Sequence, residues 1–167
     1  MLRVHPILMQ APNDQPLIRP ATLDDVSRIR AIARAAYAKY VPRIGREPAP
    51  MAADYEDEVA SQRVVVLDVE GRVSGYMVGW PEAGAYFIDN IGVDPESQGT
   101  GLGKRLIRHA ATEAHRLGLP ALRLYTNAAM TENFSLYTYL GFVETYRVSE
   151  KGFNRIYMRL DLTEKRS

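Results

Sequence analysis

The sequence contains no cysteine among its 167 residues. This absence excludes a disulfide framework, a thiolate nucleophile and any metal site that uses cysteine ligands. It also fits a cytoplasmic protein, because disulfides accumulate in oxidising compartments. The three histidines, His5, His109 and His115, are not spaced as metal ligands. We therefore expect neither a metal ion nor covalent catalysis by a thiol.

The sequence also lacks an excess of charge of either sign and a long apolar run. Its formal net charge is +1, which argues against nucleic acid or an anionic membrane as a partner. No stretch approaches the roughly 20 apolar residues of a membrane span. Residues 1–15 lack the apolar run of about 7–15 residues that a signal peptide needs. We expect a flexible leader over residues 1–15 and a single domain of ordinary length over residues 16–167.

Hydrophobic periodicity predicts an α/β domain with a mixed sheet and helices on its faces. Strands are expected at residues 17–20, 64–69, 73–80, 85–93, 121–126, 142–148 and 155–160. Helices are expected at residues 22–40, 51–60, 102–117 and 131–140, with a proline-rich loop over residues 41–50. Glu82 and Asp94 fall in turns, where we expect them to be solvated.

A glycine-rich turn follows the strand at residues 85–93 and precedes the longest expected helix. Gly99, Gly101 and Gly103 alternate there. Glycine allows consecutive backbone N–H groups to converge, and the first turn of a helix adds unpaired donors and a positive dipole end. Such a turn suits phosphate oxygens, although the glycines are equally suited to a tight strand-to-helix turn with no ligand.

The spacing of this turn excludes two common phosphate motifs. A Walker loop would need glycine at position 98 and a hydroxyl at position 105, where the chain has Gln98 and Arg105. The dinucleotide-binding pattern G-x-G-x-x-G fails because Lys104 stands where its third glycine belongs. The turn therefore calls for a different phosphate-bearing ligand.

The turn resembles the acetyl-CoA pyrophosphate loop of the GNAT superfamily of N-acetyltransferases, whose pattern is Gln/Arg-x-x-Gly-x-Gly/Ala. Gln98, Gly101 and Gly103 occupy its three fixed positions. The resemblance spans residues 18–160 and is strongest over residues 85–142. It implies a GNAT-like mixed, mostly antiparallel seven-stranded sheet flanked by about four helices, with acetyl-CoA as co-substrate. The cofactor-binding residues that it implies are Ile91, Val93, Gln98, Gly99, Thr100, Gly101, Leu102, Gly103, Lys104, Asn127, Asn133 and Tyr137.

A second motif carries the same resemblance. Family members often have Asn-x-x-Ala-x-x-Leu-Tyr-x-x-x-Gly-Phe after the fifth strand, and residues 136–142 reproduce its end. The beginning departs from the pattern, since Met130 replaces the asparagine and Asn133 the alanine. Asn133 or Asn127 is expected to supply the polar contact instead. By resemblance, Tyr137 lies beside the cofactor sulfur, where a phenol can protonate the departing thiolate. The alternative is that Tyr137 is a core aromatic.

Attack by an amine also requires a proton acceptor, because an amine with a lysine-like pKa of about 10.4 is almost entirely protonated at neutral pH. Period-two alternation predicts that Phe87, Asp89, Ile91 and Val93 share one face of their strand, with Asn90 on the other. The resemblance places the acetyl group along this strand, with a main-chain N–H near Val93 polarising its carbonyl. Asp89 is a candidate base because burial would raise its pKa. The alternative, which the sequence favours equally, is that Asp89 has a structural role and is hydrogen-bonded to neighbouring backbone.

Together these features predict an enzyme that transfers an acetyl group from acetyl-CoA to a primary amine. Direct attack in a ternary complex is expected, because no cysteine is present to hold an acyl intermediate. The acceptor, a small molecule or a peptide or protein amine, stays open. So do a longer acyl donor and a catalytically silent acyl-CoA-binding sensor or interaction module. Dimerisation is common in the family, so a homodimer is one assembly that the resemblance allows.

Overall fold

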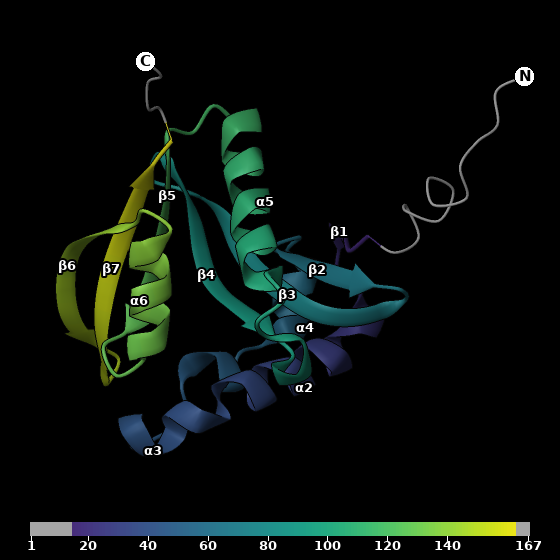
Figure 1. Ribbon diagram of the computed structural model, residues 1–167, viewed down its shortest axis with the longest axis horizontal. Coiled ribbons are helices and arrows are strands. Elements are labelled where there is room, and N and C mark those ends of the chain that lie inside the picture. The colour runs from purple at the N-terminus through teal and green to yellow at the C-terminus, as the bar shows by residue number, and fades with distance from the viewer. Residues whose placement is uncertain (1–14, 163–167) are drawn as a thin grey trace, which may run out of the picture.

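The structure is a computed structural model that describes residues 15–162, which form a seven-stranded sheet with helices on both faces (Figure 1). The strands lie in the order β1-β2-β3-β4-β5-β7-β6, and each neighbouring pair is antiparallel except β4 with β5. Their bounds are β1 (Leu17–Pro20), β2 (Val64–Val69), β3 (Arg72–Glu82), β4 (Ala85–Val93), β5 (Ala121–Asn127), β6 (Val143–Glu150) and β7 (Phe153–Asp161). The expected mixed, mostly antiparallel sheet is confirmed.

The four expected helices are present within residues 15–162. They are α2 (Val26–Tyr37), α4 (Tyr55–Ala60), α5 (Leu102–Arg116) and α6 (Thr131–Tyr139). Two single-turn 3₁₀-helices, η1 (Leu23–Asp25) and η2 (Ala38–Tyr40), flank α2. No helix in this part of the chain combines the length and the apolar character needed to cross a membrane. The predicted leader, apart from Gln15, lies outside the described residues.

The segment expected to be a loop, residues 41–50, is partly helical. Its first half forms α3 (Val41–Ile44), and its end enters the 3₁₀-helix η3 (Ala49–Met51). Both turns have proline in a first-turn position, where its missing N–H needs no helical partner. The prolines that suggested a loop therefore begin helical turns. The next helix starts at Tyr55 rather than at residue 51, because the Asp54 carboxylate caps it.

Two hydrophobic layers join the helices to the sheet. On one face, α5 buries Leu106, Ala110 and Ala114, which are four residues apart and fully enclosed. Residues of α6 pack against the same layer, so α5 and α6 cover one face (Figure 1). On the opposite face, α2 and α4 bury Ile29 and Tyr55 against β2 and β3. The amphipathic pattern of α5 thus fixes which face it covers.

The two parallel strands diverge in the middle of the sheet. β4 and β5 pair only where residues 86–88 face residues 122–124. Beyond that point β4 continues to Val93 and β5 to Asn127 without pairing, and Figure 1 shows the two strands spreading apart. Parallel strands normally share hydrogen bonds along their length, so this divergence leaves backbone groups of β4 free to bind other partners.

A β-bulge in β4 corrects the expectation for Asp89. Val78 of β3 pairs with Asn90, but the next residue of β3 pairs with Ile88, which leaves Asp89 as an extra residue. The bulge shifts the alternation by one, so Ile88 and Ile91 both pack on the α5 side. The expectation that Asp89 shares a face with Ile91 and Val93 is therefore wrong.

Candidate functional site

The glycine-rich turn joins β4 to α5 and leaves its backbone open. The 3₁₀-helix η4 (Pro95–Ser97) follows β4, and Gly101 is the N-terminal cap of α5 with a φ of 83°. Gly99 has a similar φ of 84°. No described heavy atom lies within 4 Å of the position that a Cβ would occupy at either glycine. Both glycines are therefore needed for their left-handed backbone, and a ligand can approach the main chain there.

The first turn of α5 presents unpaired backbone donors. The first backbone bond along α5 is donated by the Arg105 amide to the Gly101 carbonyl, at 3.1 Å. The amides of residues 102–104 precede this bond and have no acceptor within the helix. These amides lie at the positive end of the helix dipole. This turn is therefore chemically suited to phosphate oxygens.

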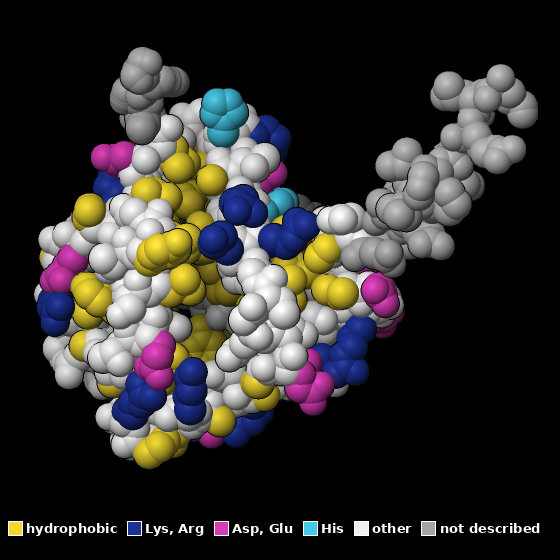
Figure 2. All heavy atoms as spheres, in the orientation of Figure 1, with side chains coloured by type: hydrophobic (Ala, Val, Ile, Leu, Met, Phe, Trp, Pro, Cys, Tyr) yellow, Lys and Arg dark blue, Asp and Glu magenta, His cyan; other side chains and the backbone are white. Residues whose placement is uncertain are grey.

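A groove of about 440 Å³ runs from this turn toward α6. Figure 2 shows the face hollowed between α6 and the beginning of α5, with lysine and arginine side chains gathered around the hollow. The predicted cofactor-binding residues that line the groove are Ile91, Val93, Gln98, Gly99, Gly101, Leu102, Gly103, Lys104, Asn133 and Tyr137. Cations around an amide-lined groove favour an anionic ligand.

Two predicted cofactor residues are not among the groove's lining. The Thr100 hydroxyl donates to the Ser97 carbonyl at 2.6 Å, so this side chain holds the turn itself. The Asn127 Oδ1 accepts from the Ala129 amide at 2.9 Å and shapes the turn between β5 and α6. Asn133 is the asparagine that reaches the groove. Thr100 and Asn127 therefore support the site through the backbone turns that they stabilise.

The free edge of β4 also borders the groove. The Tyr37 hydroxyl donates to the Ile91 carbonyl at 2.8 Å, and the Gln98 side-chain amide donates to the Val93 carbonyl at 3.1 Å. Residues of an antiparallel ladder point their backbone groups alternately toward and away from the partner. Ile91 and Val93 thus direct their N–H groups into the gap left by β5. The sequence does not reveal this contact of Tyr37, since nothing local to α2 indicates a partner 54 residues away.

An ion pair fixes the end of β4. Arg28 of α2 donates to the Asp94 carboxylate at 2.5 Å and to the Val73 carbonyl at 2.9 Å. Burial of Asp94 acts to raise its pKa, but hydrogen bonds from the Glu96 amide and from Arg28 outweigh it, so the pKa of Asp94 is lowered. The expectation that Asp94 is solvated is wrong. Its role is to hold the strand end from which the glycine-rich turn departs.

Tyr137 of α6 lies where the groove meets a second, narrower cavity. Its ring packs edge-on against Phe142, with 5.8 Å between the centroids. Burial raises the pKa of Tyr137 to about 12, so the phenol carries its proton at neutral pH. No hydrogen bond to its hydroxyl is found within residues 15–162. The hydroxyl is therefore available to a ligand.

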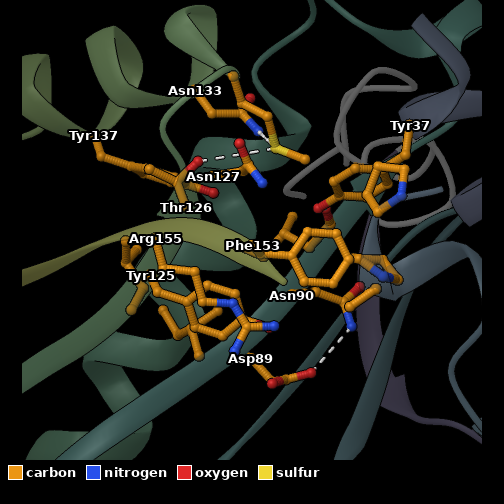
Figure 3. Close-up of a pocket in the computed structure, with 17 residues that line it drawn as sticks. Tyr37, Asp89, Asn90, Tyr125, Thr126, Asn127, Asn133, Tyr137, Phe153 and Arg155 are labelled. Carbon is orange, nitrogen blue, oxygen red and sulfur yellow. Dashed lines mark hydrogen bonds between the residues drawn. The ribbon is translucent and has the colours of Figure 1, made fainter. Parts of the chain in front are cut away.

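The narrower cavity, here called the neck, leads from Tyr137 to Asp89 (Figure 3). Its volume is about 40 Å³. Apolar side chains dominate its wall, including Ile88, Leu124 and Phe153. Beyond the neck is an open pocket of about 520 Å³, here called the outer pocket, which also borders Asp89. Asp89 thus lies between the neck and the outer pocket.

The surroundings of Asp89 favour its neutral form. Burial raises the pKa of Asp89, and a hydrogen bond from Asn90 at 3.4 Å together with the charge of Arg155 offsets this only in part. Arg155 itself is bound to Glu150 at 2.9 Å and lies over the Tyr125 ring at 4.2 Å. Asp89 has no ion-pair partner among the described residues, so its carboxylate can accept a proton. Within residues 15–162, no cluster of three or more His, Asp or Glu side chains could hold a metal ion.

Comparisons with known proteins agree with this arrangement. A sequence model of the acetyltransferase (GNAT) family matches residues 28–142. The mycothiol acetyltransferase of Pseudarthrobacter chlorophenolicus is 34% identical over 124 residues, which cover 67% of this chain and 37% of that protein. The chain spans about a third of the length of the curated relatives it matches.

Solved structures share the fold. The ribosomal-protein-S18-alanine N-acetyltransferase of Escherichia coli superposes with a TM-score of 0.69 at 21% identity, covering 92% of this chain and 97% of that one. YncA of Salmonella typhimurium, solved with acetyl-CoA, has a TM-score of 0.64 at 23% identity, with coverages of 91% and 96%. The family match covers most of the sequence and coincides with this fold. The chain belongs to the acetyltransferase (GNAT) family.

Proposed function

We propose that the protein transfers an acetyl group from acetyl-CoA to a primary amine. The observation that carries this proposal is the position of Tyr137, where an amide-lined groove and a second cavity meet. One cavity suits a phosphate-bearing donor, and the other gives an acceptor a separate route to the same point. The acetyl-CoA in the YncA structure supports the choice of donor.

The chain's own groups fit this donor. Acetyl-CoA supplies the acetyl group as a thioester. The amides between Gln98 and Lys104 bind the pyrophosphate, with Thr100 holding the turn, and Lys104 adds a positive charge. The free N–H groups of Ile91 and Val93 hold the acyl end along β4, where a backbone donor to a carbonyl oxygen can contribute about 3 kcal/mol in the transition state. Asn133 is the polar contact beside Tyr137.

Tyr137 and Asp89 move the two protons of the reaction. The amine nitrogen forms a bond to the acetyl carbon while the carbon–sulfur bond breaks, and the Tyr137 hydroxyl protonates the departing sulfur. Asp89, at the other end of the neck, accepts the proton that the amine loses, directly or through water. Its raised pKa suits this role, because a stronger base is a better proton acceptor.

A screen of amines, with release of free thiol from acetyl-CoA as the readout, tests the proposal. We expect turnover of at least one primary amine and the formation of its N-acetyl product. Binding of acetyl-CoA with no thiol release on a broad panel would instead favour a silent sensor. Replacing acetyl-CoA by succinyl-CoA in the same assay tests the donor, and we expect the acetyl donor to react faster.

A further inference from the structure

Two buried acceptor atoms border the outer pocket without partners. Within residues 15–162, Glu58 Oε1 and Asn90 Oδ1 are the buried side-chain polar atoms that lack a hydrogen bond. Asn90 is only 7% exposed, and both residues line the outer pocket. The nearest cation to Glu58 is Arg63, whose Nη1 lies 3.6 Å from Oε1, beyond hydrogen-bond distance. A buried unpaired acceptor is unfavourable, so both atoms would be stabilised by a ligand that donates.

The charges of the outer pocket indicate the kind of donor. Asp89 lines the outer pocket together with Glu58 and Asn90. Figure 3 shows the Asn90 amide nitrogen directed at the Asp89 carboxylate, which occupies the donor end of the amide and leaves its oxygen free. Arg155, the nearest buried cation, is bound to Glu150. The outer pocket is lined by more acidic side chains than basic ones, and this excess suits a protonated amine. The acidic residues are Asp54, Glu58, Glu82, Asp89 and Glu150, and the basic ones are Lys151 and Arg155.

The neck restricts the shape of the acceptor. At about 40 Å³, it has room for about three water molecules, at 10–15 Å³ each. Its wall is largely apolar, with Ile88, Leu124 and Met130 among the residues that line it. A chain of methylene groups suits a small and largely apolar cavity of this kind better than a bulky ring does. The acceptor is therefore expected to be slender between its two polar ends.

We infer that the acceptor is an unbranched diamine or polyamine, an inference that rests on the proposed function. One amine passes through the neck to Tyr137, and a second, protonated amine is held in the outer pocket by Glu58 and Asn90. The held amine is not the one acetylated, because carboxylates keep an ammonium protonated and a protonated amine has no free electron pair for attack. Glu58 and Asn90 are thus specificity-determining residues.

The test compares kcat/KM for 1,4-diaminobutane with that for 1-aminobutane, using the full chain and acetyl-CoA. The two amines differ only in the second ammonium group. We expect kcat/KM to be about tenfold to 100-fold higher for the diamine, because a hydrogen bond to a charged group contributes a factor of this size. Glu58→Gln and Asn90→Leu should each lower this preference about tenfold. Glu56→Gln is the matched control, since Glu56 lies on the same helix, pairs with Arg30 and borders none of the three cavities.

The possible outcomes distinguish failure of the diamine inference from failure of the proposed acetyltransferase function. Turnover of both amines at equal kcat/KM would overturn the diamine site and leave the acetyltransferase proposal intact. A preference unaltered in both folded variants, or faster reaction of a lysine peptide or a cyclic diamine than of any linear diamine, would also overturn it. Absence of turnover with every amine would overturn both.

Discussion

The proposed mechanism gives Tyr137 its most specific chemical role. We predict that Tyr137→Phe lowers turnover by about 10²–10⁴-fold, because we propose its hydroxyl as the proton donor to the departing sulfur. The ring's packing against Phe142 is retained, so the affinity for acetyl-CoA should not change. Steady-state thiol release and calorimetry measure the two quantities separately. Unchanged turnover would show that Tyr137 is only a packing residue.

As the proposed base, Asp89 would couple activity to stability. Its folded-state pKa is raised above its unfolded value, chiefly by burial. The folded state therefore binds this proton more tightly than the unfolded state, and ionised Asp89 destabilises the fold at neutral pH. This penalty disappears as the pH falls through the folded pKa toward the unfolded value of about 3.9.

We predict that Asp89→Asn raises the free energy of unfolding at pH 7 and lowers turnover by at least about 10²-fold. The stability difference from the natural chain should shrink when urea unfolding is repeated near pH 4, because folded Asp89 is protonated to a greater extent there than at pH 7. A variant that is less stable at pH 7, or that keeps full turnover, would contradict the assignment of Asp89 as base.

Local sequence was sufficient for some residues of the site and not for others. The spacing of Gln98, Gly101 and Gly103 is a local signal, and all three line the groove. The sequence did not reveal that Asp94 is buried in an ion pair, because its partner Arg28 is 66 residues away. An ion pair between distant segments leaves no periodic trace in either segment, so only the folded chain reveals it.

At the scale of elements, the glycine-rich turn depends on backbone conformation. We predict that Gly101→Val lowers the affinity for acetyl-CoA by at least about 100-fold, because a β-branched residue is strained at a φ of 83° and covers the open main chain. Gly84→Val is the matched control. Gly84 has a φ of 80° in the turn between β3 and β4, with no described atom near its Cβ position, and it borders none of the three cavities.

Calorimetry on both variants, after circular dichroism has shown that they fold, separates strain from ligand binding. Gly84→Val should bind acetyl-CoA as the natural chain does. Normal affinity in Gly101→Val would mean that the turn is structural and holds no phosphate.

The succession of strands and helices along the chain followed from the sequence, whereas the bulge in β4 did not. Alternation in residues 85–93 predicts one continuous face, and pairing with β3 breaks it at Asp89. The sequence nevertheless contained an indication of the bulge, since Gly79 interrupts the apolar run of β3 beside it. Glycine within a strand often indicates a β-bulge. A Cβ at Gly79 would lie 2.8 Å from the Tyr86 ring, so the close packing there requires glycine.

At the scale of the whole molecule, two cavities reach Tyr137 from different parts of the sheet, and we propose that one serves the donor and the other the acceptor. The groove reaches it from the α5 end of the sheet, and the neck reaches it from the outer pocket. With no cysteine in the chain, we predict a sequential mechanism. Initial rates measured while both substrates are varied should give intersecting double-reciprocal lines. Parallel lines with a covalent acetyl-enzyme would contradict direct transfer.

The binding of coenzyme A by the backbone amides of residues 98–104 is the claim on which the other roles depend. Titration calorimetry of the folded, full-length chain with coenzyme A tests it most directly. We predict saturable binding with one coenzyme A per chain, abolished by Gly101→Val and retained in Gly84→Val and Tyr137→Phe. The absence of any binding heat at millimolar coenzyme A would contradict the account.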